Sequence, residues 1–198
     1  MRINTTRLRC IIGWLGMLLP WIVCLLVGYI PDSISATWYT NACTVFMIIL
    51  GSASLLLISY KGYDWLDDLV LTTAGICGLG ICLFPTGTQL VSDTHVGTFM
   101  LPMHVSSSIH MLFAILFFVL LAYNSIFLFT KGSSEPTKNK KIRNKIYIVC
   151  GIGMLAAFLL MLLPDFYAKV WIVETIALFF FGLSFLTKAE AYKFLFKD

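Results

Sequence analysis

Six long apolar segments dominate the sequence, and short polar segments separate them. The apolar segments cover about residues 10–30, 41–60, 66–84, 103–130, 144–163 and 168–187. Roughly 20 residues of helix, each adding about 1.5 Å, are enough to cross the hydrocarbon core of a bilayer. The pattern therefore predicts an all-α polytopic membrane protein, a single domain with six transmembrane helices.

Composition supports this class. Of the 198 residues, 59% are hydrophobic and only 12% are charged, which is not the balance of a soluble domain of this length. The first apolar segment follows Arg2, Arg7 and Arg9, as in a signal peptide. It continues to Ile30 without a small-residue cleavage site, so we expect it to be a retained helix.

The basic residues predict an orientation. If the N-terminus is cytoplasmic, all but one of the 14 Lys and Arg residues lie on the cytoplasmic side, and only Lys169 lies outside. Cytoplasmic segments carry an excess of basic residues, so this distribution predicts that both termini are cytoplasmic. We interpret the basic run at 138–145 as an orientation signal that contacts anionic lipid, and we expect no nucleic-acid binding.

Among the acidic, basic and histidine side chains, two lie several residues inside the predicted spans, away from the span ends. Glu174 is about six residues into the last segment from its outer end, and His110 lies at a similar depth in the fourth. An ionisable side chain at membrane depth is costly and marks a candidate functional site. Their similar depth would allow Glu174 and His110 to pair.

Other polar residues cluster near the same outer end. Ser106 and Ser107 precede His110 by four and three residues and so share its helical face, whereas His104 is turned about 120° away. Together with polar residues at the start of the second segment, they predict an outward-facing polar pocket. The candidate ligand-binding residues are His110, Glu174, Ser106, Ser107, His104, Tyr39 and Asn41.

This constellation permits several interpretations. Glu174 and His110 could be a buried pair that holds helices together, a ligand pocket, a catalytic or metal site, or part of an ion path. His95, His104 and Asp93 could join His110 as zinc ligands, but the histidine spacings of nine and six residues match no compact ligand motif. We therefore predict no metal site and leave cofactors open.

Several motifs recur in a known pattern. They are Ser-Ile-Ser-Ala-x-Trp-Tyr-Thr-Asn at 33–41, Leu-x-Ile-Ser-Tyr-Lys-Gly-Tyr-Asp at 56–64, Ala-Gly-Ile-x-Gly-Leu-Gly at 74–80, and related stretches at 109–131 and 171–190. These motifs resemble a group of small bacterial membrane proteins of the domain-of-unknown-function and Frag1/DRAM/Sfk1-like kind. The resemblance implies a place in the bacterial inner membrane, and it implies that His110 and Glu174 belong to the group's pattern. It implies no particular activity.

A more distant analogy leads to the CREST membrane hydrolases. The element Ser106-x-x-x-His110 is similar to their Ser-x-x-x-His element. The chain departs from that family because it has six predicted spans and no His-x-x-x-His in a seventh. Enzymatic activity is therefore left open.

The leading functional hypothesis is binding or sensing of a lipid or small ligand at the outer leaflet, by a monomer or a homo-oligomer in the lipid bilayer. One rival is a metal-dependent lipid hydrolase, which requires a zinc site. The other is a small channel or transporter, which requires His110 or Glu174 to line a continuous water path.

Overall fold

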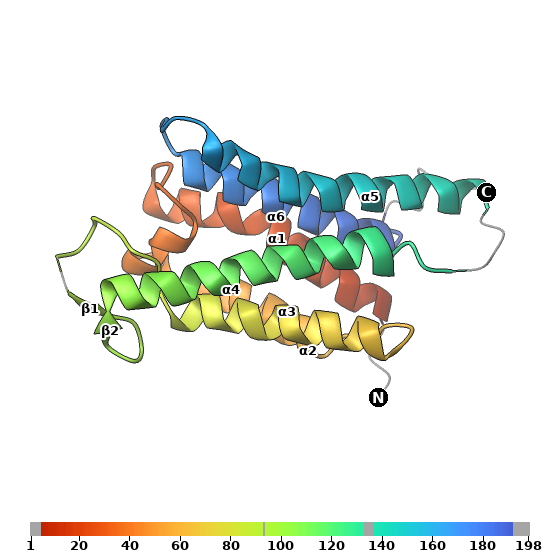
Figure 1. The fold of residues 1–198 in the computed structure, drawn as a ribbon, viewed down its shortest axis with the longest axis horizontal. Helices are drawn as coiled ribbons and strands as arrows, with labels where there is room; N and C mark the ends of the chain where they lie inside the picture. The colour runs from red at the N-terminus through yellow and green to blue at the C-terminus, as the bar shows by residue number, and fades with distance from the viewer. Residues whose placement is uncertain (1–4, 93, 133–136, 192–198) are drawn as a thin grey trace.

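The computed structural model describes residues 5–92, 94–132 and 137–191, and these form an all-α bundle (Figure 1). The prediction of an all-α fold is confirmed for this part of the chain. The six helices are α1 (Thr5–Val27), α2 (Cys43–Ile58), α3 (Trp65–Leu83), α4 (Met103–Tyr123), α5 (Lys138–Leu159) and α6 (Lys169–Lys188).

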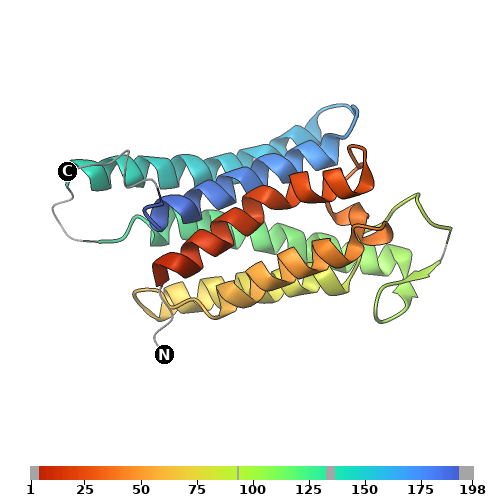
Figure 2. The ribbon, with the colours of Figure 1, turned by 180° about the vertical axis from the view of Figure 1, so that it is seen from behind.

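The helices form two layers of three. Figures 1 and 2 show α5, α6 and α1 in one layer and α4, α3 and α2 in the other. Around the bundle each helix packs on the next, in the order α6, α1, α2, α3, α4 and α5, and α5 returns to α6. In contrast, the backbones of α4 and α6 lie farther apart across the bundle, and large side chains fill the space between them; the ring centres of Phe117 and Phe181 are 6.2 Å apart.

Five helices are long and apolar enough to cross a membrane, and α2 is shorter. The five are α1, α3, α6, α4 with its extension to Leu128, and α5 with its extension to Leu162. The predicted second segment, 41–60, contracts to the 16 residues of α2 because a 3-10 helix, η1 (Ser35–Tyr39), and a turn precede it. At about 1.5 Å per residue, 16 residues reach less far than the roughly 30 Å hydrocarbon core.

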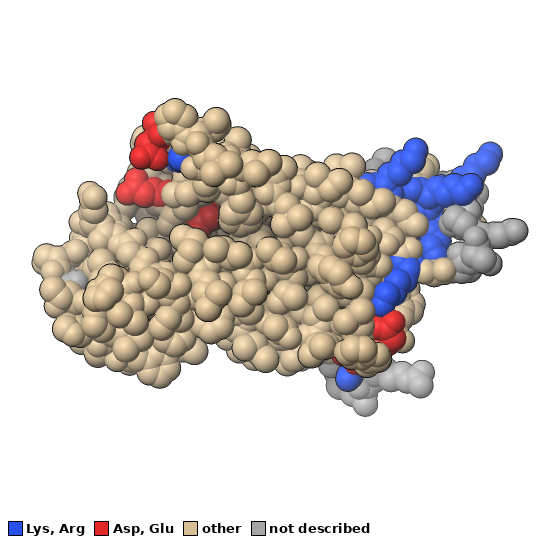
Figure 3. All heavy atoms as spheres, viewed as in Figure 1, with Lys and Arg blue, Asp and Glu red and all other residues tan. Residues whose placement is uncertain are grey.

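The middle of the molecule has an apolar exterior. Leu25, Leu162 and Ile48, on three different elements, are 83%, 82% and 60% exposed. Figure 3 shows an uncharged surface between the ends, with Lys and Arg gathered at one end. A large exposed apolar surface of this kind suits contact with lipid, so the chain is a membrane protein.

Glycines bring α1 and α6 into close contact. A Cβ atom on Gly182 would lie 2.6 Å from the carbonyl oxygen of Gly13, and one on Gly13 would lie 2.9 Å from the carbonyl oxygen of Gly182. Small residues allow membrane helices to pack backbone against backbone. This contact fixes α6, and with it Glu174, against α1.

Two short features were not predicted from the sequence. The fourth segment, 103–130, is α4 followed by a π-helical turn, η2 (Asn124–Leu128). Before α4, the strands β1 (His95–Val96) and β2 (Leu101–Pro102) form a small antiparallel pair in which His95 faces Pro102. The sequence pattern indicated neither feature, since a π turn and two-residue strands leave no periodicity.

Candidate functional site

Glu174 is the sixth residue of α6 and binds the connection between α1 and α2. Its Oε2 accepts a hydrogen bond from the backbone N–H of Ile34 at 2.5 Å, and its Oε1 accepts one from the Ser35 hydroxyl at 2.9 Å. One turn earlier, the Trp171 N–H donates to the Asp32 carbonyl at 3.0 Å. The carboxylate therefore fastens η1 and its approach to the start of α6.

A narrow cleft lies beside this carboxylate, between the two helix layers. Its volume is about 40 Å³. On this measure one water molecule needs about 10–15 Å³, so the cleft admits about three waters or the first few methylenes of a chain that continues outside it. Figure 3 shows that this face of the molecule is hollowed near the end opposite the basic one. The lining residues are Leu19, Ile34, Ser35, Phe46, Leu50, Ile81, Ala114, Phe117, Phe118, Glu174 and Leu178.

The cleft is apolar apart from one carboxylate and one hydroxyl. Aromatic side chains from α2 and α4 and aliphatic ones from α1, α3 and α6 form its walls. Glu174 is partly exposed, whereas Ile34 and Ser35 are only 2% and 8% exposed. A hydrogen-bonding group at one end of an apolar slot is the arrangement that orients an amphiphilic ligand.

His110 belongs to a different hydrogen-bond network. Its Nδ1 lies 2.7 Å from the carbonyl oxygen of Phe84, so the Nδ1–H donates to that carbonyl. The buried Ser106 hydroxyl donates to the next carbonyl, that of Pro85, at 2.8 Å. Both side chains satisfy carbonyls that the end of α3 leaves without helical partners.

The structure thus gives Glu174 and His110 separate partners. In the part of the chain that the structure describes, no hydrogen bond or ion pair joins them, and His110 does not line the Glu174 cleft. Equal depth does not ensure contact, because Glu174 reaches toward the α1–α2 connection while His110 faces the end of α3. The pocket that we expected to contain both residues is therefore corrected to a cleft built on Glu174.

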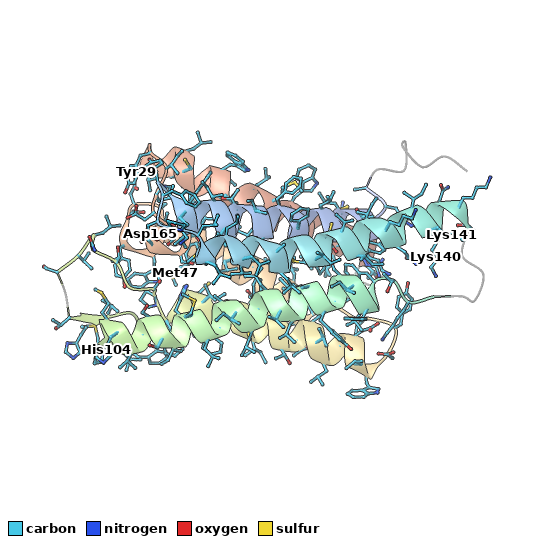
Figure 4. The ribbon with its side chains drawn as sticks, turned by 45° about the horizontal axis from the view of Figure 1, so that its top comes forward. Tyr29, Met47, His104, Lys140, Lys141 and Asp165 are labelled. Atoms are coloured by element: carbon cyan, nitrogen blue, oxygen red, sulfur yellow. The ribbon has the colours of Figure 1, made fainter. Side chains whose placement is uncertain are left out.

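The other predicted ligand-binding residues lie outside the Glu174 cleft. Ser107 and His104 line a shallow surface depression over the loop before β1, and Figure 4 shows His104 at the tip of α4, away from Asp165. The Tyr39 hydroxyl donates to the Thr86 carbonyl at 2.7 Å. Asn41 donates to the Leu26 carbonyl at 3.0 Å and so ties α2 to the end of α1.

The hydrogen bond of Tyr39 holds together two loops at the Glu174 end of the bundle. Burial raises the pKa of the Tyr39 phenol, which keeps it a neutral donor over the whole physiological range. Its acceptor, Thr86, follows the end of α3, so η1 is tied to α3 as well as to α6. These two attachments of η1 position Ile34 and Ser35 as donors to Glu174. The sequence analysis did not identify either residue as a partner of Glu174.

The histidines and carboxylates do not form a metal site within residues 5–92, 94–132 and 137–191. No group of three His, Cys, Asp or Glu side chains there could hold a metal ion. His95 lies beside the Thr94 hydroxyl, at 3.0 Å, and is exposed in β1. Asp93, the carboxylate considered with these histidines, lies outside the described residues.

At the opposite end, an ion cluster joins α3 to the segment after η2. Lys131 Nζ lies 2.8 Å from Asp64 Oδ2 and 2.7 Å from Asp67 Oδ1. Asp64 also caps α3 by accepting from the N–H groups of Leu66 and Asp67. The hydrogen bond from Lys131, followed by those from the backbone, lowers the pKa of Asp64, and the same carboxylates raise the pKa of Lys131.

The chain matches no protein-family model, no curated protein and no solved structure. The resemblance to small bacterial membrane proteins stays a prediction, and the function must be argued from the geometry.

Proposed function

We propose that this protein crosses the bacterial inner membrane six times, with both termini in the cytoplasm, and binds a narrow amphiphilic molecule in the Glu174 cleft. The occupant is a lipid or small ligand with one slim apolar chain and an ammonium or hydroxyl group. In this orientation the cleft opens toward the outer leaflet.

The charge distribution supports the orientation. Arg9, Lys131, Lys140, Arg143 and Lys188 lie together around one end, which we call the basic end. Lys169, at the opposite end, is largely buried and is held by the Leu163 carbonyl at 2.6 Å and the Asp165 carboxylate at 3.3 Å. Basic residues favour the cytoplasmic side, and the paired Lys169 adds little charge to the other.

One observation carries the binding proposal: a partly exposed carboxylate stands in an otherwise apolar cleft. A carboxylate offers about four acceptor positions, and the Ile34 and Ser35 donors occupy two of them. The remaining positions suit a donor on a ligand. An ammonium is favoured most, because it also offsets a charge that is expensive to keep at membrane depth.

The fastening of η1 to α6 does not by itself require a cleft. A purely structural carboxylate would be packed on all sides, whereas Glu174 borders open space lined by Ala114, Phe117 and Leu178. The substitution Glu174→Gln separates the two roles. Its amide still accepts from Ile34 and donates to Ser35, but it loses the charge that attracts an ammonium.

The test uses the full-length protein in phosphatidylcholine nanodiscs and three twelve-carbon probes: dodecylamine, dodecanol and dodecanoate. Dodecylamine should raise the unfolding temperature most, dodecanol less and dodecanoate not at all, because binding to the folded state alone stabilises it. Glu174→Gln should remove the preference for the amine. The control Asp32→Asn changes an exposed carboxylate at the same end and should preserve it.

Two results would contradict the proposal. Equal stabilisation by dodecylamine and dodecanoate would show that the carboxylate does not select the ligand. Retention of the full amine effect in Glu174→Gln would show that the amine binds elsewhere.

A further inference from the structure

A second cavity lies at the basic end, on the far side of the molecule from the Glu174 cleft. Its volume is about 220 Å³, and it is lined mainly by polar and charged groups. Five basic side chains and one acidic one contribute to its wall. They are Arg9 from α1, Lys131 from the segment after η2, Lys140 and Arg143 from α5, Lys188 from α6, and Glu190.

The basic run at 138–145 divides into two faces. Lys140, Arg143, Asn144 and Tyr147 line the cavity, at the spacing of one helical face. In contrast, Lys138, Lys141 and Lys145 are exposed and do not line it. Lys140 and Lys141 are neighbours at this end of α5 (Figure 4). An orientation signal requires only that basic residues lie at this end. It does not explain why Lys140 and Arg143 both line one cavity.

The described residues do not balance all the charges around the cavity. Glu190 pairs with Arg143 at 3.3 Å, and Lys131 is neutralised by Asp64 and Asp67. The other three cations, Arg9, Lys140 and Lys188, have no carboxylate partner in the part of the chain that the structure describes.

Arg9 and Lys188 are instead held by neutral groups. The Arg9 Nε–H donates to the Tyr60 hydroxyl at 2.8 Å, and Lys188 Nζ donates to the Phe129 carbonyl at 2.9 Å. Lys188 Nζ also lies 5.1 Å from the ring centre of Tyr63 and 5.6 Å from that of Tyr147. These contacts position the two cations without cancelling their charge.

Two further groups shape the cavity for a polar occupant. Gly132 has no side chain, and a Cβ atom there would overlap the Lys140 ammonium, so the glycine leaves the ammonium room at the cavity wall. The buried Oδ1 of Asn144 has no partner among the described residues, and as an acceptor it would take a donor such as water or a hydroxyl of the ligand. A buried polar atom without a partner is costly unless water or a ligand supplies one.

We propose that this cavity binds a phosphate ester, with Arg9, Lys140, Arg143 and Lys188 as its ligands. Arginine contributes a planar fork that matches phosphate oxygens, and lysine contributes point charges. The cavity lies at the end of the spans, at the level of the cytoplasmic headgroups in the orientation proposed above. Basic pockets between helices at that level bind anionic headgroups. A free phosphorylated molecule offers the same chemistry.

Three probes on the full-length protein in a neutral detergent separate these sources: dioctanoyl phosphatidylglycerol, dioctanoyl phosphatidylcholine and glycerol 3-phosphate, titrated calorimetrically. Phosphatidylglycerol should bind more tightly than the zwitterionic phosphatidylcholine. Lys140→Gln should weaken phosphatidylglycerol about fivefold, since one basic residue near an anionic surface contributes about 1 kcal/mol. Lys141→Gln makes the same charge change on the exposed face and should alter the affinity less than about twofold.

Each outcome decides the matter. If glycerol 3-phosphate binds with the same dependence on Lys140, the phosphate ester alone is sufficient; if only phosphatidylglycerol binds, the occupant is a lipid. Arg143→Gln with the control Lys145→Gln provides a second pair of variants. The proposal is overturned if neither phosphatidylglycerol nor glycerol 3-phosphate binds. It is also overturned if Lys141→Gln and Lys145→Gln weaken binding as much as Lys140→Gln and Arg143→Gln.

Discussion

Removal of the Glu174 carboxylate should destabilise the end of the bundle opposite the basic end. In Glu174→Ala, the Ile34 N–H and the Ser35 hydroxyl both lose their acceptor, and both residues are less than a tenth exposed. An unsatisfied buried donor costs about 1–3 kcal/mol. The Ser35 hydroxyl can turn to another acceptor. The free energy of unfolding should therefore fall by about 3 kcal/mol when both donors lose Glu174.

The conservative variant should be much less harmful. Glu174→Gln can keep both hydrogen bonds. Its free energy of unfolding should fall by less than about 1 kcal/mol, because only the added strength of a charged acceptor is removed. Asp32→Ala, an exposed carboxylate at the same end, should change stability by less than about 0.5 kcal/mol.

Unfolding of the full-length protein in mixed micelles of a mild detergent and dodecyl sulfate measures these differences, with helicity as the signal. The expected order of stability is wild type, then Glu174→Gln, then Glu174→Ala. If Glu174→Ala is as stable as wild type, or if the two variants lose the same amount, the fastening of η1 to α6 does not stabilise the fold as argued.

Three other predictions follow from the packing and the charges. Gly182→Ala should cost about 1–3 kcal/mol because its methyl would lie against a backbone carbonyl of α1, whereas Gly51→Ala, with open space beside it, should be neutral in the same unfolding assay. Because Lys131 lowers the pKa of Asp64, their hydrogen bond stabilises the fold above the ordinary pKa of an aspartate, and this stability is lost as the pH falls through the lowered value. The wild-type unfolding midpoint should therefore drop more in acid than that of Asp64→Asn. Ala114→Leu should fill the Glu174 cleft and abolish stabilisation by dodecylamine in nanodiscs, and an undiminished effect would place the amine elsewhere.

The short second helix shows where local pattern fails. Residues 41–60 are apolar enough to read as one segment, but α2 has only 16 residues. Its N-terminal end follows η1, which Glu174 holds from α6 and which Tyr39 ties to the end of α3. Contacts that distant in sequence leave no signal in the hydrophobic pattern.

The candidate site shows the same limit. The sequence singled out Glu174 and His110 because an ionisable group within an apolar segment is costly, and the structure shows Glu174 partly buried and His110 3% exposed. The sequence did not indicate their partners, which are a backbone N–H and a hydroxyl about 140 residues from Glu174 and a carbonyl 26 residues from His110. A backbone donor has no residue type and cannot be recognised in a sequence.

The sequence by itself determined the class of the protein, the approximate helix positions and the end at which the basic residues gather. These follow from apolar run lengths and charge positions, which are local properties. Only the tertiary structure decided that Glu174 and His110 lie in separate networks and that Lys140 lines a cavity while Lys141 is exposed. Those outcomes depend on how each helix is rotated about its axis, and the rotation is set by packing against neighbours from distant parts of the chain.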